Sequence, residues 1–177
     1  MAQNFAAAYR ATAWQAVFCS PLQRAQMTAA PLCESLNLQI ELREGLAEIG
    51  YGEWESQSVE TVNRDFHDDY LRWTSDPAWN APTNGETAIA VAQRALSVVE
   101  EIKSRFEDGN VLIVSHKATI RILLCSLLGI DVGRFRFRLG CPVASLSVVE
   151  FSAHGPLLHS LADRTHLDER LRALPGT

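Results

Sequence analysis

The sequence predicts a three-layer α/β domain in which a mostly parallel sheet is covered by helices on both faces. Two segments carry this prediction, residues 16–36 and 111–129, because each joins a short apolar run to a helical pattern through a polar junction. A long amphipathic segment at 86–106 lies between them. The chain has 177 residues, of which 47% are hydrophobic, and this is enough for one core but not for two. Residues 1–177 are therefore expected to form a single domain.

The first part of the chain shows helical and strand signals in turn. Residues 2–14 have apolar side chains at helical spacing with no capping residue before them, which predicts a chain that starts inside a helix. Residues 16–19 form an apolar run, read as a strand, that ends at Ser20 and Pro21. Serine suits the N-cap and proline the first position of a helix, which is expected to reach about Leu36.

The middle of the chain is less regular. Residues 38–42 alternate as a strand does. The periodic signal weakens from 43 to 84, although aromatic and aliphatic side chains at helical spacing predict a helix within 59–74, so this segment is interpreted as a partly helical excursion. A long helix is expected over about 86–106. Three tryptophans of the excursion are expected to pack in the core or at its rim rather than line a pocket: Trp54, Trp73 and Trp79.

The last third of the chain begins with a second strand-to-helix unit. Residues 111–114 form a continuous apolar run, typical of a strand covered on both faces, and a helix to Gly129 follows the polar junction. Residues 144–151 and 157–162 are expected to form a closing pair of strands. The charged tail at 168–177 is expected to be mobile.

Charge, hydropathy and cysteine usage exclude several functional classes. Sixteen Lys and Arg against 21 Asp and Glu give a net charge of −5, which provides no general basic surface for nucleic acid or anionic lipid. The longest apolar stretch, 120–130, is too short to cross a membrane. No cationic leader precedes an apolar run, so the cytoplasm is the expected compartment. The four cysteines are widely spaced, which predicts neither a disulfide framework nor a zinc site.

Cationic side chains follow both strand-to-helix junctions. Arg24 lies in the first turn of one predicted helix, and Ser115, His116 and Lys117 open the other. Because the carboxyl ends of parallel strands meet at one edge of a sheet, these groups are expected to converge on an anion, with arginine as a forked donor to phosphate oxygens. Each group alone also has a structural interpretation as an ion pair, a cap or a strand end. Ser115 and Lys117 are candidates for phosphate contacts on this basis.

Four motifs occur along the chain in a fixed order, followed by a closing Asp163-x-x-His166-Leu167. They are Ser20-Pro21-Leu22-x-Arg24-Ala25-x-x-Thr28-Ala29, Leu46-x-Glu48-x-x-Tyr51-Gly52-x-Trp54-Glu55, Pro82-x-x-Gly85-Glu86 and Val114-Ser115-His116. Over nearly the whole chain they resemble the histidine phosphatase superfamily, also called phosphoglycerate-mutase-like. The resemblance implies hydrolysis of a small phosphorylated metabolite without a metal ion or other cofactor.

The resemblance also implies roles for individual residues. Arg24 corresponds to a phosphate-binding arginine, His116 to the second histidine of the family site, and Glu48 to the proton donor for the leaving oxygen. The excursion at 43–84 then lies on the substrate side of the domain. Glu86, after Gly85, is expected to start a helix rather than contact substrate.

The chain departs from the family pattern at the nucleophile. Relatives carry an Arg-His-Gly motif at the end of their first strand, and its histidine becomes phosphorylated. No histidine precedes His67 in this sequence. The chain therefore resembles a family member that lacks its first strand, which is a central one in the family sheet. A sheet with such a gap is expected to leave unpaired backbone groups and to favour pairing with a second copy.

Three interpretations of function stay open. The first is a phosphatase whose true start lies upstream, and the second is a catalytically silent module that binds phosphoesters. The third, an unrelated nucleotide-binding protein, is the weakest because no Gly-rich phosphate loop is present. Only 33 residues separate Gly52 from Glu86, where the mutases of the family have a longer insertion, so a small phosphatase is favoured over a phosphoglycerate mutase.

Overall fold

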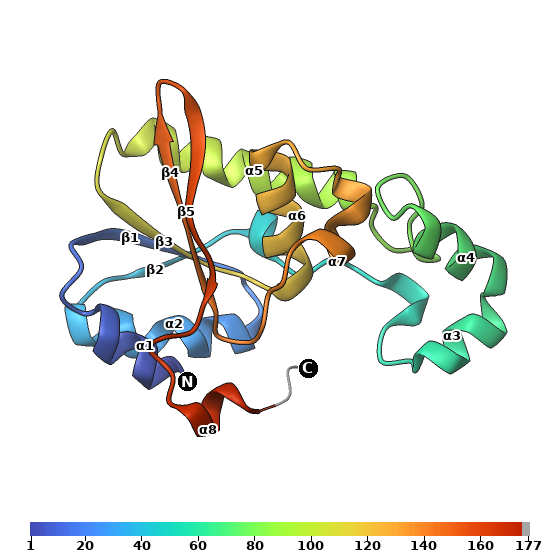
Figure 1. Ribbon diagram of the computed structural model, residues 1–177, viewed down its shortest axis with the longest axis horizontal. Coiled ribbons are helices and arrows are strands. Elements are labelled where there is room, and N and C mark those ends of the chain that lie inside the picture. The colour runs from blue at the N-terminus through green and yellow to red at the C-terminus, as the bar shows by residue number, and fades with distance from the viewer. Residues whose placement is uncertain (175–177) are drawn as a thin grey trace.

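A three-stranded parallel sheet forms the centre of the computed structural model, which describes residues 1–174 (Figure 1). The strand order is β2 (Ile40–Leu42), β1 (Trp14–Cys19), β3 (Asn110–Val114), with β1 in the middle. Both pairings are parallel, as each connection passes through helices. The predicted α/β class is confirmed.

Helices cover both faces of this sheet, and the alternation of side chains along β1 shows which face each helix covers. Val17 and Cys19 pack against α1 (Ala2–Tyr9) and α2 (Gln23–Leu36). Ala16 and Phe18 point the other way, toward α5 (Ala88–Arg105). The helix α6 (Lys117–Leu128) packs beside α5 on this second face. The four residues are almost fully buried, as expected for a strand enclosed by two helical layers.

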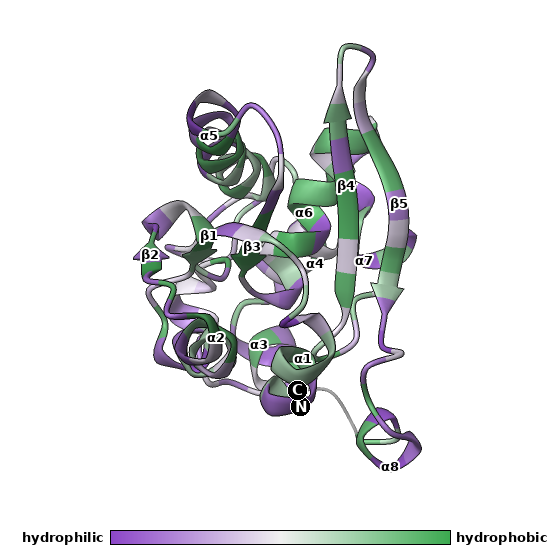
Figure 2. Cartoon of the chain, turned by 90° about the vertical axis from the view of Figure 1, so that its left-hand side faces the viewer, coloured by the Kyte–Doolittle hydropathy of each residue, from purple (hydrophilic) through white to green (hydrophobic). Residues whose placement is uncertain are grey.

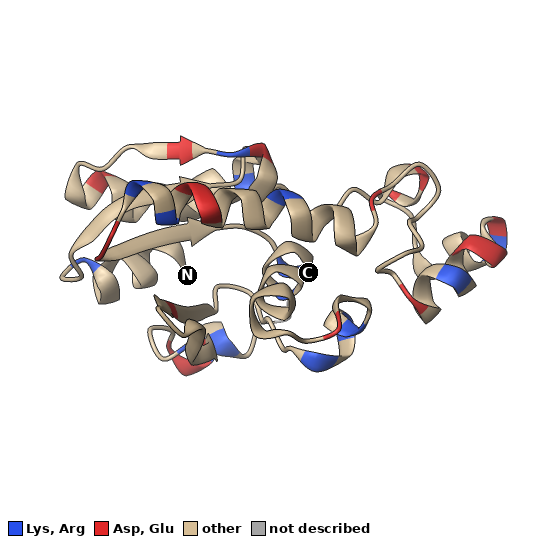
Figure 3. Cartoon of the chain, turned by 90° about the horizontal axis from the view of Figure 1, so that it is seen from above, with Lys and Arg blue, Asp and Glu red and all other residues tan. Residues whose placement is uncertain are grey.

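The excursion at 43–84 contains two short helices, α3 (Val59–Asp65) and α4 (His67–Ser75), which extend away from the sheet (Figure 1). Trp54 and Trp73 are buried there among aromatic rings, as expected, although Trp73 also lines a cavity, whereas Trp79 is 75% exposed and does not pack in a core. Figure 3 shows Lys and Arg interspersed with Asp and Glu along the molecule. The remaining short elements are η1 (Glu44–Leu46), η2 (Gly52–Trp54), η3 (Val132–Arg134), α7 (Phe135–Arg138) and α8 (Glu169–Arg172).

Two helices begin later than the sequence predicts. Helix α2 begins at Gln23 with Leu22 at its N-cap, because the buried hydroxyl of Ser20 accepts the Leu22 N–H at 3.2 Å and also bonds a histidine. Helix α5 begins at Ala88, where the Thr87 hydroxyl accepts the Ala90 N–H at 3.1 Å. Both helices begin later for the same reason. In each case the residue that was predicted to start the helix bonds to a residue outside that helix.

The strands β4 (Leu146–Ser152) and β5 (Gly155–Asp163) form an antiparallel hairpin that is a separate sheet (Figure 2). Among residues 1–174, only β1 pairs with β3, so β3 is an edge strand. Leu112 alone of the run 111–114 is buried, which corrects the expectation of a strand covered on both faces. A cavity of about 1090 Å³ lies along this edge, between Leu112–Val114 and Leu146.

The charged tail contains one helical turn within the described residues. Asp168 caps α8 by accepting the Leu171 N–H at 2.8 Å, and the Arg164 guanidinium donates to the Arg172 carbonyl at 2.6 Å. Residues 175–177 lie outside the described residues, and the mobility of the tail at 168–177 stays a prediction. Across residues 1–174, no helix combines the length and the apolar character that spanning a membrane requires.

The open edge of β3 predicts a pattern of amide exchange. Ser20 N–H donates to the Val114 carbonyl at 2.9 Å, so Val114 and, two residues before it, Leu112 direct their polar backbone groups toward β1. Val111 and Ile113 direct theirs toward the open edge of the sheet. We expect the Val111 and Ile113 amides to exchange faster than those of Leu112 and Val114, measured by NMR-detected hydrogen exchange in a dilute monomer.

The matched control for this measurement is β1, which is paired on both edges. Its Val17 and Phe18 amides are both expected to be strongly protected. Equal protection of Ile113 and Val17 in the monomer would contradict the open edge.

Candidate functional site

The cavity along β3 extends to the carboxyl ends of β1 and β3, where it forms a charged cleft. Four cationic side chains and one carboxylate line it: Arg24, Lys117, Arg121, Arg136 and Glu48. The chain as a whole has a net charge of −5, whereas the side chains that line the cleft carry an excess of positive charge. Anions are the ligands that such a cleft favours.

Arg24 and His116 meet inside this cleft. The Arg24 Nε donates to the His116 Nδ1 at 3.2 Å, and the His116 Nε2 lies 2.7 Å from the Ser20 Oγ. Ser20 follows β1 and His116 follows β3, and the backbone bond from Ser20 to Val114 holds these two strand ends side by side. The structure thus brings together the two junctions that the sequence singles out.

Burial sets the charge state of His116, whose side chain is enclosed with Ser20. Desolvation lowers its pKa below the usual 6.5, the nearby Glu48 opposes this shift, and Arg24 adds to it. A guanidinium only donates, so Nδ1 is the acceptor and the proton of the neutral ring sits on Nε2. The neutral imidazole therefore donates from Nε2 to the Ser20 hydroxyl.

Glu48 lies against the first turn of α6. Its Oε1 accepts from the backbone N–H of Ile49 at 3.0 Å and of Thr119 at 3.1 Å. Its Oε2 accepts from the Ala118 N–H at 3.3 Å, while the Thr119 hydroxyl donates to the Ala47 carbonyl at 2.7 Å. The N–H groups of Ala118 and Thr119 are among those that a helix leaves without partners inside itself. Glu48 therefore caps α6 from another segment while lining the cleft.

Arg94 of α5 holds the loop that carries Glu48. It donates to three backbone carbonyls of this loop, those of Gly45 at 2.8 Å, Ala47 at 2.8 Å and Glu48 at 3.2 Å. Its Nε and Nη2 also form a forked ion pair with Glu86 at 2.9 and 3.0 Å. The loop is therefore fixed to α5 through a single side chain.

The Gly85-Glu86 motif braces the same loop. Glu86 was expected to start α5, but the helix begins at Ala88. Glu86 instead accepts the Gly50 N–H at 2.8 Å and thereby supports the loop. A Cβ at Gly85 would lie 2.6 Å from the Gly50 carbonyl oxygen, closer than any side chain tolerates. Glycine is required there by the close approach of two backbone segments.

Ser115 and Lys117 occupy different surroundings. The Ser115 hydroxyl donates to the Leu46 carbonyl at 2.7 Å, which ties the end of β3 to the loop before Glu48. Lys117 is exposed at the rim of the cleft and, among residues 1–174, its ammonium has no hydrogen-bond or ion-pair partner. Its charge is thus available to a ligand.

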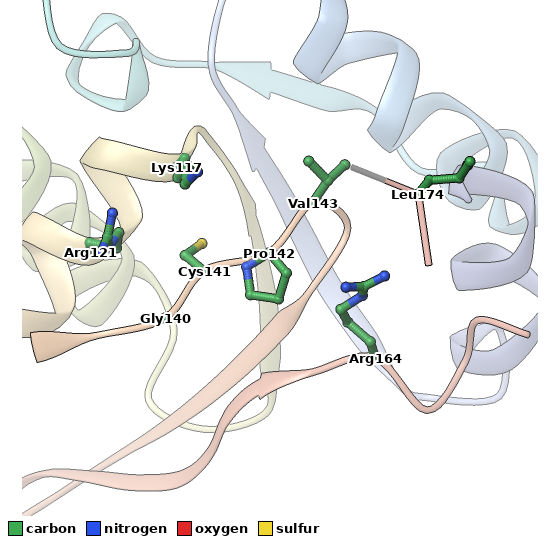
Figure 4. A pocket seen from close by; sticks show the side chains of 8 residues that line it. All are labelled: Lys117, Arg121, Gly140, Cys141, Pro142, Val143, Arg164 and Leu174. Atoms are coloured by element: carbon green, nitrogen blue, oxygen red, sulfur yellow. The ribbon is translucent and has the colours of Figure 1, made fainter. Parts of the chain in front are cut away.

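A smaller cavity of about 390 Å³ opens beside the cleft (Figure 4). Lys117, Arg121 and Cys141 line one side of it, and Arg164 comes from the other side of the segment that contains Pro142. Burial raises the pKa of the Cys141 thiol. Within residues 1–174, no cluster of three or more His, Cys, Asp or Glu side chains is arranged to hold a metal ion.

Three residues of the site were not singled out by the sequence. Thr119 lies in the first turn of α6, Arg94 lies in the middle of a helix, and Arg136 lies in the short helix α7, which the sequence does not predict. Each acts on residues distant along the chain. The only available hint was the presence of an arginine on an otherwise apolar helix surface at Arg94.

Comparisons with known proteins agree on one family. The family model for the histidine phosphatase superfamily (branch 1) matches residues 1–164. The chain is 31% identical over 153 residues to phosphoserine phosphatase 1 of Hydrogenobacter thermophilus, covering 86% of this chain and 72% of that protein. It is 29% identical over 143 residues to the adenosylcobalamin/alpha-ribazole phosphatase of Escherichia coli, covering 79% and 70%. The solved structure of Bacillus stearothermophilus YhfR matches with a TM-score of 0.86 at 24% identity, covering 93% of this chain and 82% of that one.

The Arg94 contacts predict a large effect on stability. Arg94→Ala removes a forked ion pair and three bonds to loop carbonyls, so we expect the free energy of unfolding to fall by about 2 to 4 kcal/mol in urea denaturation. The control is Lys103→Ala on the same helix, whose exposed pair with Glu100 contributes little. Equal effects of the two variants would contradict the role given to Arg94.

The lowered pKa of His116 predicts how stability depends on pH. The unfolded chain takes up a proton near pH 6.5, whereas the buried ring takes it up only at lower pH, so this contribution to stability is lost as the pH falls through that window. We expect His116→Gln to flatten the decline in stability between about pH 7 and pH 5. The exposed His154→Gln is the control and should keep the wild-type slope. Parallel pH profiles for wild type and His116→Gln would refute this assignment.

Proposed function

Because the chain belongs to the histidine phosphatase superfamily, we propose that its cleft binds the phosphate group of small phosphomonoesters, which are hydrolysed when the family nucleophile is present. One observation carries this proposal, the contact between Arg24 and His116 at the adjacent ends of β1 and β3. It supplies a cationic fork and a neutral imidazole at the edge of a parallel sheet where ligands of such folds bind. The excess of positive charge in the cleft supports the same conclusion.

Arg24 is the proposed phosphate ligand. Its Nε is occupied by His116, while its two terminal nitrogens have no hydrogen-bond partner within residues 1–174. Two parallel N–H donors match two phosphate oxygens. His116 orients this guanidinium through Nδ1, while its Nε2–H is held by the buried Ser20 hydroxyl. Lys117 adds charge from the rim, whereas Ser115 supports the site through its bond to the Leu46 carbonyl.

Glu48 is the proposed proton donor to the leaving oxygen. Hydrolysis breaks the bond between phosphorus and the ester oxygen, and that oxygen needs a proton as it departs. Oε1 accepts two backbone N–H groups, whereas Oε2 has one contact at 3.3 Å. The freer Oε2 is the oxygen that would hold the proton. The N–H donors of α6 fix the carboxyl group in the cleft.

The presence or absence of the family nucleophile distinguishes a phosphatase from a protein that only binds phosphoesters. In relatives with Arg-His-Gly, the histidine forms a bond to phosphorus and water later releases the phosphate. No histidine precedes His67 here, so these 177 residues hold phosphate and a proton donor without the family nucleophile. We propose that they bind phosphoesters without appreciable turnover, and that restoring a strand with Arg-His-Gly produces a phosphatase. Electrostatic binding survives the loss of a nucleophile, but the covalent step does not.

The names of relatives support a small phosphorylated metabolite as ligand, since phosphoserine phosphatase and adenosylcobalamin/alpha-ribazole phosphatase are among them. The short interval between Gly52 and Glu86 favours a phosphatase over a mutase. Independence of metal ions follows from the family resemblance. Cytoplasmic location and pairing with a second copy stay predictions.

Binding of inorganic phosphate tests the site. We expect Arg24→Gln to weaken phosphate binding in isothermal titration by about tenfold or more, because a forked, charge-assisted contact is lost. Arg10→Gln, an equal change of charge at an exposed position outside the cleft, should bind phosphate as the wild type does. Equal loss in both variants would show that only net charge matters, and no binding by the wild type would refute the proposed site.

Turnover tests the missing nucleophile. We expect residues 1–177 to leave an aryl phosphate intact and to form no trapped phosphoenzyme. Once the upstream strand is restored, Glu48→Gln should lower the rate by roughly 10² to 10⁴. Robust turnover by residues 1–177, abolished by His116→Ala and accompanied by phosphorylation of His116, would make His116 the nucleophile and overturn this assignment.

A further inference from the structure

The smaller cavity beside the cleft carries positive charge without a counter-charge. Its wall includes Lys117, Arg121 and Arg164, and within residues 1–174 no Asp or Glu side chain lines it. Arg94 and Arg105 each pair with an acid, whereas none of these three cations has an ion-pair partner among the described residues. A cavity with three positive charges and no acidic group favours an anionic ligand.

The two guanidinium groups of this cavity are held in place by some of their nitrogens. Arg121 donates from Nε to the Leu139 carbonyl at 2.6 Å and from Nη2 to the Arg136 carbonyl. Arg164 donates from Nη2 to the Arg172 carbonyl at 2.6 Å, and its Nε is enclosed. The Nη1 of each arginine has no hydrogen-bond partner among residues 1–174, and neither Nη1 is one of the enclosed polar atoms that lack a partner. Each arginine therefore offers a ligand one nitrogen whose position is already fixed.

The positive charges lie at two ends of the smaller cavity (Figure 4). Lys117 and Arg121 lie one turn apart on α6 and line the same side, whereas Arg164 directly follows β5 and comes from the other side. The apolar side chains of Pro142 and Val143 line the wall between these ends. A ligand that contacts both ends must carry two anionic groups that are separated by an apolar spacer.

The number of free donors at each end favours carboxylates over phosphates. Arg164 offers a single nitrogen with two N–H groups, which suits the two oxygens of a carboxylate better than the three terminal oxygens of a phosphate. Two carboxylates bring a charge of −2, which the three cations of the cavity can balance. The volume of about 390 Å³ is at the lower end of the range for small-molecule sites, so the spacer between the carboxylates is short.

We propose that the smaller cavity binds a short aliphatic dicarboxylate, with one carboxylate at Lys117 and Arg121 and the other at Arg164. This site is separate from the proposed phosphate site, because Gly140, Arg164 and Leu174 line the smaller cavity but not the cleft. The inference therefore does not depend on the proposed function. The apolar wall between the two ends contacts the methylene groups of the ligand.

A pair of isomers tests the proposal. Glutarate and ethylmalonate have the same composition and charge, but the two carboxylates of ethylmalonate are on one carbon and cannot reach both ends of the cavity. We expect the wild type to bind glutarate about tenfold more tightly at constant ionic strength. Affinity is measured by NMR titration of the Gly140 amide, because Gly140 lines this cavity and not the cleft. Adipate and propylmalonate form a second pair of isomers, and equal affinities within both pairs would refute the proposal.

Three variants show whether Arg164 binds the second carboxylate. Arg164→Gln should abolish the preference for glutarate and keep the affinity for ethylmalonate within about twofold, because only one end of the site is lost. Arg170→Gln, an equal change of charge at an exposed position outside both cavities, should keep the preference. Asp168→Ala removes the side-chain cap of α8 but leaves Arg164 in place, and it should also keep the preference.

The other outcomes separate the failure of this inference from that of the proposed function. If Asp168→Ala loses the preference as Arg164→Gln does, Arg164 acts by holding the tail and the inference is wrong. If Arg24→Gln removes the preference and Arg164→Gln does not, the dicarboxylate binds in the cleft and the inference is also wrong. A wild type that prefers glutarate but does not bind inorganic phosphate would refute the proposed function alone. Retained affinity for ethylmalonate shows that Arg164→Gln is folded.

Discussion

The position of Arg94 determines the geometry of the cleft. Its guanidinium binds three carbonyls of the loop before Glu48 and pairs with Glu86, which in turn holds Gly50. Glu48 is thereby placed against the first turn of α6, where its carboxylate accepts from two N–H groups and caps the helix. The end of β3 is tied to the same loop through Ser115. A single half-buried cation thus aligns an acidic loop, a helix start and a strand end.

The electrostatics of the cleft are local, and they differ from those of the whole chain. An acidic protein gathers four cations around one carboxylate because strand ends and helix starts from distant segments meet there. His116 does not add to this charge, since burial keeps its ring neutral and the ring instead orients Arg24. The cleft can therefore attract a phosphoester without a basic surface elsewhere.

The open edge of β3 borders the cleft. An edge strand leaves every second residue without a backbone partner, and the hairpin β4–β5 stands apart across the cavity. The family resemblance places a central strand in the sheet, and the sequence lacks the Arg-His-Gly motif that this strand carries in relatives. The open edge therefore bears on stability, because it leaves backbone groups of β3 without strand partners among residues 1–174.

Local sequence patterns determined which segments form helices and strands. Contacts between segments that are distant along the chain decided where the helices begin and which residues hold the site in place. Apolar runs and helical periodicity were sufficient for β1, β3, α5 and α6, because burial and hydrogen bonding within an element follow from neighbouring residues. The motifs also identified Arg24, Glu48 and His116 as candidates. Ser20 looked like an N-cap, but its hydroxyl bonds a histidine 96 residues away. Arg94 and Arg136 had no pattern around them, since their partners are set by packing between helices, loops and aromatic rings rather than by sequence spacing.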